Sequence, residues 1–203
     1  MSDILDLIDA AGLTPAAYLD IMTEQAGADP ATAADDSALE KLEFTKLNLH
    51  RTGRISRTWQ PSADLAGLLA RLNTKQTWLV LTEPWCGDSA QCLPCLVTMA
   101  EQQPDITVRL VLRDENLDLM DRYLTNGSRS IPRLVAFDTE GNELFQWGPR
   151  PAAAQEVFQA AKDEGLEKPD ILERLHLFYG RNRGVALDAE FVTLLNAYLD
   201  GNQ

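Results

Sequence analysis

Short apolar runs alternate with helical patterns along the middle of the chain, and this alternation constrains the fold more than any other feature. Strand-like runs occupy residues 55–59, 78–81, 106–112, 134–137 and 144–147, the last two flanking a hairpin turn at 139–142. Helical patterns lie among and after them, over residues 62–72, 86–102, 117–124 and 151–162. This order predicts an α/β fold with a central mixed sheet. We expect the sheet to be largely parallel, with helices on both faces and an antiparallel hairpin at its edge.

Both ends of the chain have helical patterns that lack the spacing of a catalytic or ligand motif. Thr14 and Pro15 mark one helix start, and Ser37 with Glu40 matches a capping box that opens a helix toward residue 50. Apolar stripes predict two further helices over residues 169–179 and 187–199. We therefore predict a helical extension over residues 1–53, an α/β domain over 54–165, and a C-terminal helical extension over 166–203 that packs on that domain.

Composition excludes several classes of function. The 203 residues carry a formal net charge of −13, which disfavours binding to nucleic acid or to an anionic membrane surface. No apolar run approaches the roughly eighteen residues of a membrane span, and the acidic N-terminus does not resemble a secretory signal. The three cysteines lie within ten residues and do not form a disulfide framework. We expect a reducing, cytoplasmic location.

The run Trp85-Cys86-Gly87-Asp88-Ser89 lies where a predicted strand gives way to a helix. Cys86 is expected at or just before the start of the helix. Unpaired amide hydrogens and the helix dipole favour an anion there. Such a position favours the thiolate, which is the reactive form of cysteine.

Three features in this order carry a family resemblance: Trp85-Cys86-Gly87, then Pro94, then Ser130-Ile131-Pro132. Over about residues 55–165 the chain resembles the thioredoxin superfamily, and within it bacterial thioredoxin-like proteins with Trp-Cys-Gly-Asp at the active site. The resemblance implies a thioredoxin fold with Cys86 as the nucleophile. It places Ser89 where a dithiol enzyme has its resolving cysteine. It also implies a kink at Pro94, a cis bond at Pro132, and substrate contacts from Trp85, Gly87, Ile131 and Pro132.

Two residues depart from the pattern of a dithiol thioredoxin, in addition to Ser89. Val80 stands where thioredoxin has a buried aspartate, and Asp88 replaces the proline between the two cysteines. A carboxylate in the first helical turn competes with a thiolate for the positive end of the dipole. We therefore expect Asp88 to leave the pKa of Cys86 only mildly lowered.

Cys92 and Cys95 form a Cys-x-x-Cys pair inside the predicted helix, where packing is the expected role. Six residues of helix separate Cys86 from Cys92, a rise of about 9 Å, whereas a disulfide needs Cα atoms within roughly 7 Å. Cys86 is therefore expected to lack an intramolecular partner. A metal site and a Cys-His hydrolase are disfavoured, because His50 and His176 lie in helical patterns without ligand spacing.

Arginines gather near the predicted site despite the acidic total. Arg129 and Arg133 flank the predicted cis-proline, and Arg150 follows the last strand. Ile131-Pro132-Arg133 is similar to the Val-Pro-Arg of many glutaredoxins, which implies glutathione as a co-substrate and no resident cofactor. Solvated surface arginines remain the alternative. Arg109 is expected to offset the charge of Asp88.

Three functional hypotheses remain open. In the first, Cys86 attacks protein disulfides or glutathione-mixed disulfides as a monothiol oxidoreductase, with Ser89 and Asp88 as neighbours, and an external thiol resolves the product. In the second, the protein is a redox-inactive binding module that holds an extended peptide beside Ile131-Pro132. In the third, the terminal helices form a homodimer or partner surface.

Overall fold

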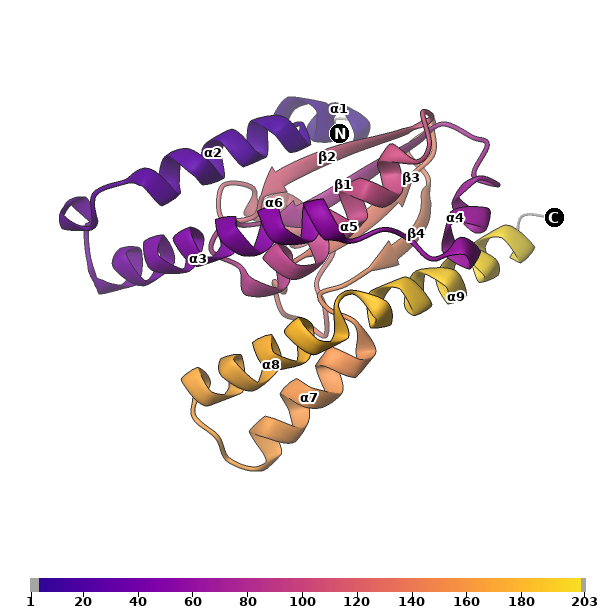
Figure 1. Cartoon of the computed structure of the whole chain (residues 1–203). Coiled ribbons are helices and arrows are strands. Elements are labelled where there is room, and N and C mark those ends of the chain that lie inside the picture. Colours follow the sequence, from indigo (N-terminus) through magenta and orange to yellow (C-terminus); the bar gives the residue numbers. More distant parts are fainter. Residues whose placement is uncertain (1–3, 202–203) are drawn as a thin grey trace.

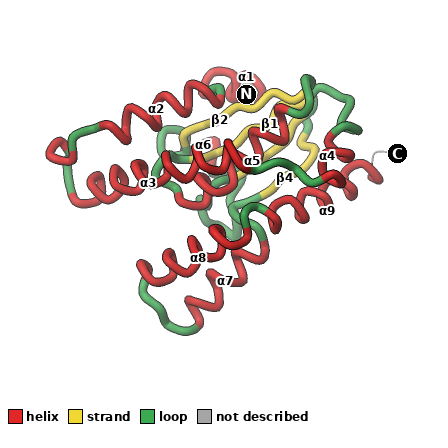
Figure 2. The backbone as a smooth tube through the Cα atoms, in the orientation of Figure 1, coloured by secondary structure: helices red, strands yellow, loops and turns green. Residues whose placement is uncertain are grey.

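The computed structural model describes residues 4–201 as four strands and a larger set of helices (Figures 1 and 2). The strands are β1 Gln76–Thr82, β2 Ile106–Leu112, β3 Arg133–Phe137 and β4 Glu143–Trp147. The helices before and around β1 are α1 Ile4–Ala11, α2 Pro15–Gly27, the 3-10 turn η1 Pro30–Thr32, α3 Asp36–Thr58, α4 Ala63–Leu69 and α5 Gly87–Glu101. The later helices are α6 Leu117–Met120, α7 Ala152–Asp163, α8 Lys168–Asn182 and α9 Val185–Gly201.

The four strands form one mixed sheet in the order β2-β1-β3-β4. β1 pairs with β2 in parallel, but β1 with β3 and β3 with β4 are antiparallel. The predicted mixed sheet and its hairpin edge are confirmed, whereas the expectation of a largely parallel sheet is wrong. The run of apolar residues shows that a strand is buried, but it carries no information on the direction of its partner.

The strand predicted at residues 55–59 does not exist, because residues up to Thr58 continue α3. Ile55 is partly buried against the core, and Trp59, the C-cap of α3, is buried. These apolar residues therefore pack the helix against the core. α3 also begins earlier than the predicted capping box. The carboxylate of Asp35 accepts a hydrogen bond from the Ala38 N–H at 2.8 Å, and Ser37 lies inside the first turn. The predicted cap of α2 at Thr14 is confirmed, because its hydroxyl accepts from Ala17.

Alternate residues of β1 enter two cores on opposite faces of the sheet. Trp78 and Val80 belong to the larger core, which takes residues from α2, α4, α5, α8 and α9. Leu79 and Leu81 belong to the smaller core, which takes residues from α1 and α6. The period of two in a strand accounts for this division. The predicted helical cover of both faces is therefore present.

The helices near the two termini pack directly on the sheet. Phe191 of α9 is fully buried, with its ring 6.4 Å from Trp78 and 5.5 Å from Trp147. Leu13, between α1 and α2, exchanges two backbone hydrogen bonds with Leu110 at the outer edge of β2. α7 and α8 lie side by side and extend away from the sheet (Figure 1). Within residues 4–201, no helix is both long enough and apolar enough to cross a bilayer.

Candidate functional site: a buried thiol beside a cleft

Cys86 is the N-cap of α5, as the sequence predicts. The buried strand β1 ends at Thr82, and the turn that follows delivers the thiol to the start of the helix. The Ser89 N–H donates to the Cys86 Sγ at 3.5 Å, and the thiol donates to the carbonyl of Ile131 at 3.4 Å. The Ile131-Pro132 bond is cis, as predicted. Two segments about 45 residues apart in sequence thus meet at one sulfur.

The electrostatic environment of the thiol differs from the prediction. Burial, and then the charge of Asp88, raise the pKa of Cys86 to about 11, although Ser89 and the nearby backbone favour the thiolate. Cys86 is only 8% exposed. The expected mild lowering of this pKa is therefore wrong, because desolvation penalises the thiolate more than the helix terminus stabilises it. The sequence predicts the position of Cys86 correctly, but it does not indicate how far the thiol is buried.

Asp88 is buried and has two partners. Its carboxylate accepts a hydrogen bond from the Tyr179 hydroxyl at 2.6 Å and pairs with the Arg150 guanidinium at 2.6 Å. Arg150 therefore reaches the site from the loop after β4, as its position in the sequence suggests. Arg109 does not offset Asp88; it lies on β2 and pairs with Asp9 at 3.5 Å. The expectation for Arg109 is wrong because that position of β2 faces α1.

A cleft of about 330 Å³ lies beside the thiol. Its walls come from the first turns of α3, the turn that carries Cys86, and α8; among the lining residues are Phe44, Trp85, Cys86, Leu172 and His176. Lys41 and Lys168 line it as well. The helical extensions thus form two of the walls beside the predicted reactive residue.

His176 covers the start of α5. A Cβ atom at Gly87 would lie 2.7 Å from its Cε1 atom, so any larger residue there would require the ring to move. Burial, and then the neighbouring Arg51, lower the pKa of His176 to about 4. At neutral pH the ring therefore carries no positive charge that would stabilise a thiolate.

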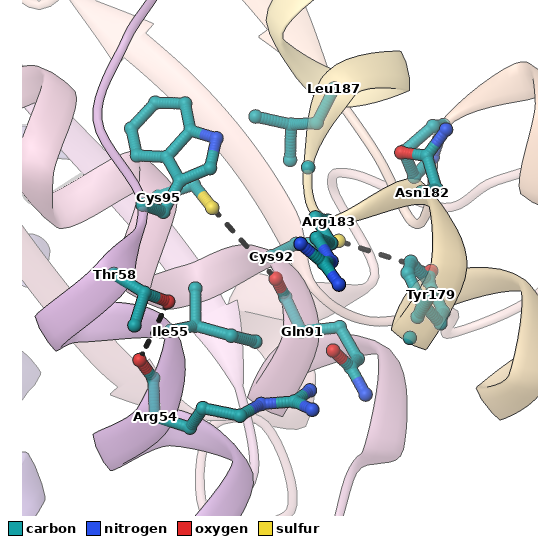
Figure 3. Close-up of a pocket in the computed structure, with 14 residues that line it drawn as sticks. Arg54, Ile55, Thr58, Gln91, Cys92, Cys95, Tyr179, Asn182, Arg183 and Leu187 are labelled. Atoms are coloured by element: carbon teal, nitrogen blue, oxygen red, sulfur yellow. Dashed lines mark hydrogen bonds between the residues drawn. The ribbon is translucent and has the colours of Figure 1, made fainter.

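Cys92 and Cys95 are buried in the larger core, as predicted. They line a second cavity (Figure 3), and Cys92 contacts the Tyr179 hydroxyl at 3.9 Å. Pro94 lies inside α5. Cys86, Cys92 and Cys95 are all free thiols. Cys86 thus has no disulfide partner, as the rise along the helix predicts.

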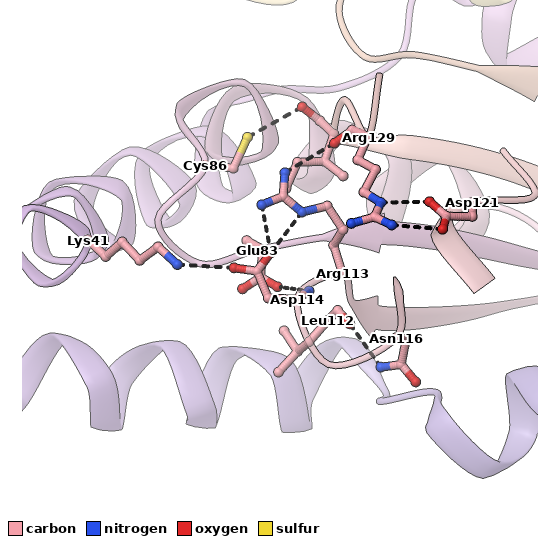
Figure 4. A network of polar contacts seen from close by, with 10 residues as sticks. Lys41, Glu83, Cys86, Leu112, Arg113, Asp114, Asn116, Asp121 and Arg129 are labelled. Atoms are coloured by element: carbon pink, nitrogen blue, oxygen red, sulfur yellow. Dashed lines mark hydrogen bonds and ion pairs between the residues drawn. The ribbon is translucent and has the colours of Figure 1, made fainter. Parts of the chain in front are cut away.

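Charged groups surround Trp85. Lys41 and Arg113 lie over its ring, at 5.0 and 4.9 Å from the centroid. Asp114 pairs with both cations, at 3.1 and 2.6 Å (Figure 4). Its backbone N–H donates to the carboxylate of Glu83, whose pKa is raised by burial. This network fixes the indole beside Cys86.

Of the remaining residues of the predicted site, Arg129 and Arg133 have partners within the protein, whereas the Ser89 hydroxyl has none among the described residues. Arg129 forms two hydrogen bonds with Asp121, at 2.6 and 2.8 Å. Arg133 donates to the Gly148 carbonyl at 3.3 Å, and to Gln146. The Ser89 hydroxyl is buried and makes no hydrogen bond of normal geometry among the described residues, although it lies near enough to favour the thiolate. Substrate binding by Arg129 and Arg133 stays a prediction.

Tyr179 and His176 are site residues that the sequence analysis did not identify. Both lie on α8, about ninety residues after the thiol in the sequence. Their rings carry polar atoms and interrupt an apolar helical stripe. This interruption is the local sequence feature that could have indicated a place in the site. No group of three or more His, Cys, Asp or Glu side chains within residues 4–201 is arranged to hold a metal ion.

The fold and the site together define a class of protein: a mixed sheet with a helix-capping cysteine that faces a cis-proline. The family model described as thioredoxin matches residues 36–162, which is more than half of the chain. The chain therefore belongs to the thioredoxin superfamily and has a thioredoxin fold with added helices.

Solved structures agree with this fold. A Pseudomonas aeruginosa protein of unknown function is 20% identical, with a TM-score of 0.65 over 100% of both chains. An HIV epitope-scaffold is 20% identical, with a TM-score of 0.62 over 98% of this chain and 99% of its own. An N-terminal domain of the alkylhydroperoxide reductase AhpF from Enterococcus faecalis matches 50% of this chain and 49% of its own, at 23% identity, but its TM-score of 0.39 supports no conclusion. No curated protein matches the chain.

Proposed function

We propose that the protein is a monothiol thiol-disulfide oxidoreductase that uses Cys86 and an external resolving thiol. The observation that carries this proposal is a single thiol at a helix N-terminus that lines a cleft and donates to the carbonyl of Ile131, the residue before the cis-proline. Ser89 stands where a second thiol would act, and Cys92 and Cys95 are packed in the core. Only an external thiol can then complete the reaction.

The reaction proceeds in two exchanges. The Cys86 thiolate attacks the sulfur of glutathione in a glutathionylated protein, forms a Cys86–glutathione disulfide and releases the protein thiolate. A second glutathione thiolate then attacks the glutathione sulfur, forms glutathione disulfide and regenerates Cys86. Protein disulfides react in the same way through a protein-linked intermediate. The raised pKa of Cys86 makes the first exchange slow at neutral pH.

The experiment is a glutathione-coupled assay on a glutathionylated peptide, across pH 7 to 10. We expect the rate to rise about tenfold per pH unit as the thiolate fraction grows, and to fall to background in Cys86→Ser. The matched control is the double variant Cys92→Ala, Cys95→Ala, which should keep the wild-type rate because its changes leave Cys86 intact. Loss of activity in that control, with the fold retained, would assign resolution to an internal thiol.

A second candidate is a redox-inactive module that binds an extended peptide beside Ile131-Pro132. The depth of Cys86, 8% exposed with a pKa near 11, favours this candidate. It predicts no Cys86-dependent turnover at any pH in that range. It also predicts that calorimetry finds the same peptide affinity for the wild type and for Cys86→Ser.

A further inference from the structure

The second cavity, of about 350 Å³, is separate from the thiol cleft and shares no lining residue with it. It lies between the last turns of α3, the middle of α5, and the junction of α8 with α9 (Figure 3). Its volume falls near the lower end of the range of about 300–1,000 Å³ that is typical of small-molecule sites. A cavity of this size can hold a small organic molecule.

One amide faces this cavity without a partner among the described residues. Gln91 is 7% exposed, and its side-chain amide makes no hydrogen bond to any residue within the range 4–201. The amide nitrogen and oxygen are not themselves sealed from solvent. Their donor and acceptor are therefore open to a ligand in the cavity.

Two arginines border the same space. Arg54 extends from α3 and Arg183 from the α8–α9 junction, both toward the region around Gln91 (Figure 3). Neither side chain forms an ion pair with a described residue, although the sequence has 31 acidic residues and only 18 lysines and arginines. Guanidinium groups present paired donors that match the two oxygens of a carboxylate.

The rest of the wall is largely apolar. It includes Ile55, Trp59, Cys92 and Leu187. The indole of Trp59 lies so close to Gly184 that a Cβ atom there would come within 2.5 Å of Nε1. The cavity thus has a cationic, amide-bearing part and a flat apolar wall.

We propose that this cavity binds a small organic carboxylate that carries an apolar chain or ring. Arg54, Arg183 and the Gln91 amide hold the carboxylate, and the apolar part lies against Trp59 and Leu187. The cavity shares no lining residue with the thiol cleft, and the proposal does not rest on the proposed function.

The test uses the indole N–H resonance of Trp59 in the full-length protein, assigned with Trp59→Phe. The probes are benzoate and hexanoate, with acetate, inorganic phosphate and neutral benzamide for comparison. We expect saturable shifts with benzoate or hexanoate, and an affinity at least about tenfold weaker in the double variant Arg54→Gln, Arg183→Gln. Arg57→Gln, Arg181→Gln is the matched control, because these arginines are exposed, as Arg54 and Arg183 are, but do not line the cavity. Cys86→Ser should bind as wild type does.

Each other outcome contradicts the proposal. Equal shifts with benzamide would show that the charge is irrelevant, and equal affinity in both double variants would exclude Arg54 and Arg183. Binding of phosphate or acetate as tightly as benzoate would indicate a simple anion site. The absence of a saturable shift with benzoate and hexanoate up to about 10 mM, where even a millimolar site would be mostly occupied, would exclude the site.

Discussion

At the scale of single residues, Asp88 connects the thiol to the rest of the molecule. Its carboxylate is held by Tyr179 and Arg150, while its charge opposes ionisation of Cys86. The ion pair is mostly buried, with Arg150 15% and Asp88 8% exposed at the side chain. The same carboxylate therefore anchors α8 and restrains the reactivity of the nearby sulfur.

Replacing Asp88 with asparagine should lower the pKa of Cys86 from about 11. The substitution removes a negative charge that raises this pKa, and it leaves the positive charge of Arg150 near the thiolate. A shift of about one unit would raise the alkylation rate at pH 8 about tenfold. The measurement is the pH dependence of iodoacetamide labelling of Cys86, in a background with Cys92 and Cys95 replaced by alanine.

Asp20→Asn is the control for this prediction, because Asp20 is exposed on α2 and makes no contact with the thiol. It should leave the labelling profile unchanged. A pKa that stays the same or rises in Asp88→Asn would show that the carboxylate does not restrain Cys86.

The sequence predicts those features of the site that depend on neighbouring residues in the chain. The junction of strand and helix places Cys86 at the helix start, and the family resemblance carried by the motifs together predicts the cis bond at Pro132. The burial of the thiol and its contacts with α8 depend on residues such as Tyr179, which is 91 positions from Asp88. No local pattern encodes such a distant pairing, so the direction of the pKa shift could not be predicted.

At the scale of elements, the contact between α5 and α8 depends on the absence of a side chain at Gly87. The imidazole of His176 occupies the space that a Cβ atom would need. Gly87 is the first residue of α5. A side chain at this position would require the ring of His176, and with it this contact between α5 and α8, to shift.

Gly87→Ala should destabilise the wild-type protein more than it destabilises His176→Ala, where the ring is absent. In the second background we expect a change within about 0.5 kcal/mol, because Gly87 is the first residue of α5 and lies outside the helix interior. Urea denaturation of the four proteins in this double-mutant cycle provides the measurement. A change of the same sign and size in both backgrounds would show that the ring does not restrict position 87.

The elements also show where sequence patterns are ambiguous. Gly53 and Ile55 lower the local preference for a helix, so residues 55–59 resemble a strand. The helix continues because Leu49 and Ile55 pack against the core, and tertiary contacts override propensity. The predicted domain boundary at residue 54 falls inside α3, and the division into three parts stays a prediction.

At the scale of the whole molecule, the larger core includes residues from α9, which lies beyond the part matched by the family model. Phe191 and Leu195 are fully buried, and Phe191 contacts the ring of Trp78 on the central strand. The C-terminal helix thus completes a core that the sheet alone leaves open.

Phe191→Ala should therefore cost about 3–5 kcal/mol of unfolding free energy, the range for a large aromatic residue in a central core. Val185→Ala is the control on the same helix, because Val185 is 67% exposed, and its effect should stay within about 0.5 kcal/mol. Chemical denaturation measures both. A cost below about 1 kcal/mol for Phe191→Ala would mean that α9 is peripheral to stability.

The position of Trp85 gives the molecule an intrinsic optical reporter. This indole lies next to Cys86, lines the cleft and is flanked by Lys41 and Arg113, whereas the other tryptophans are buried: Trp59, Trp78 and Trp147. A small collisional quencher should therefore reach Trp85 before the others. Any molecule that enters the cleft would shield this emission or displace the two cations, so occupancy beside the thiol can be followed by fluorescence without a label.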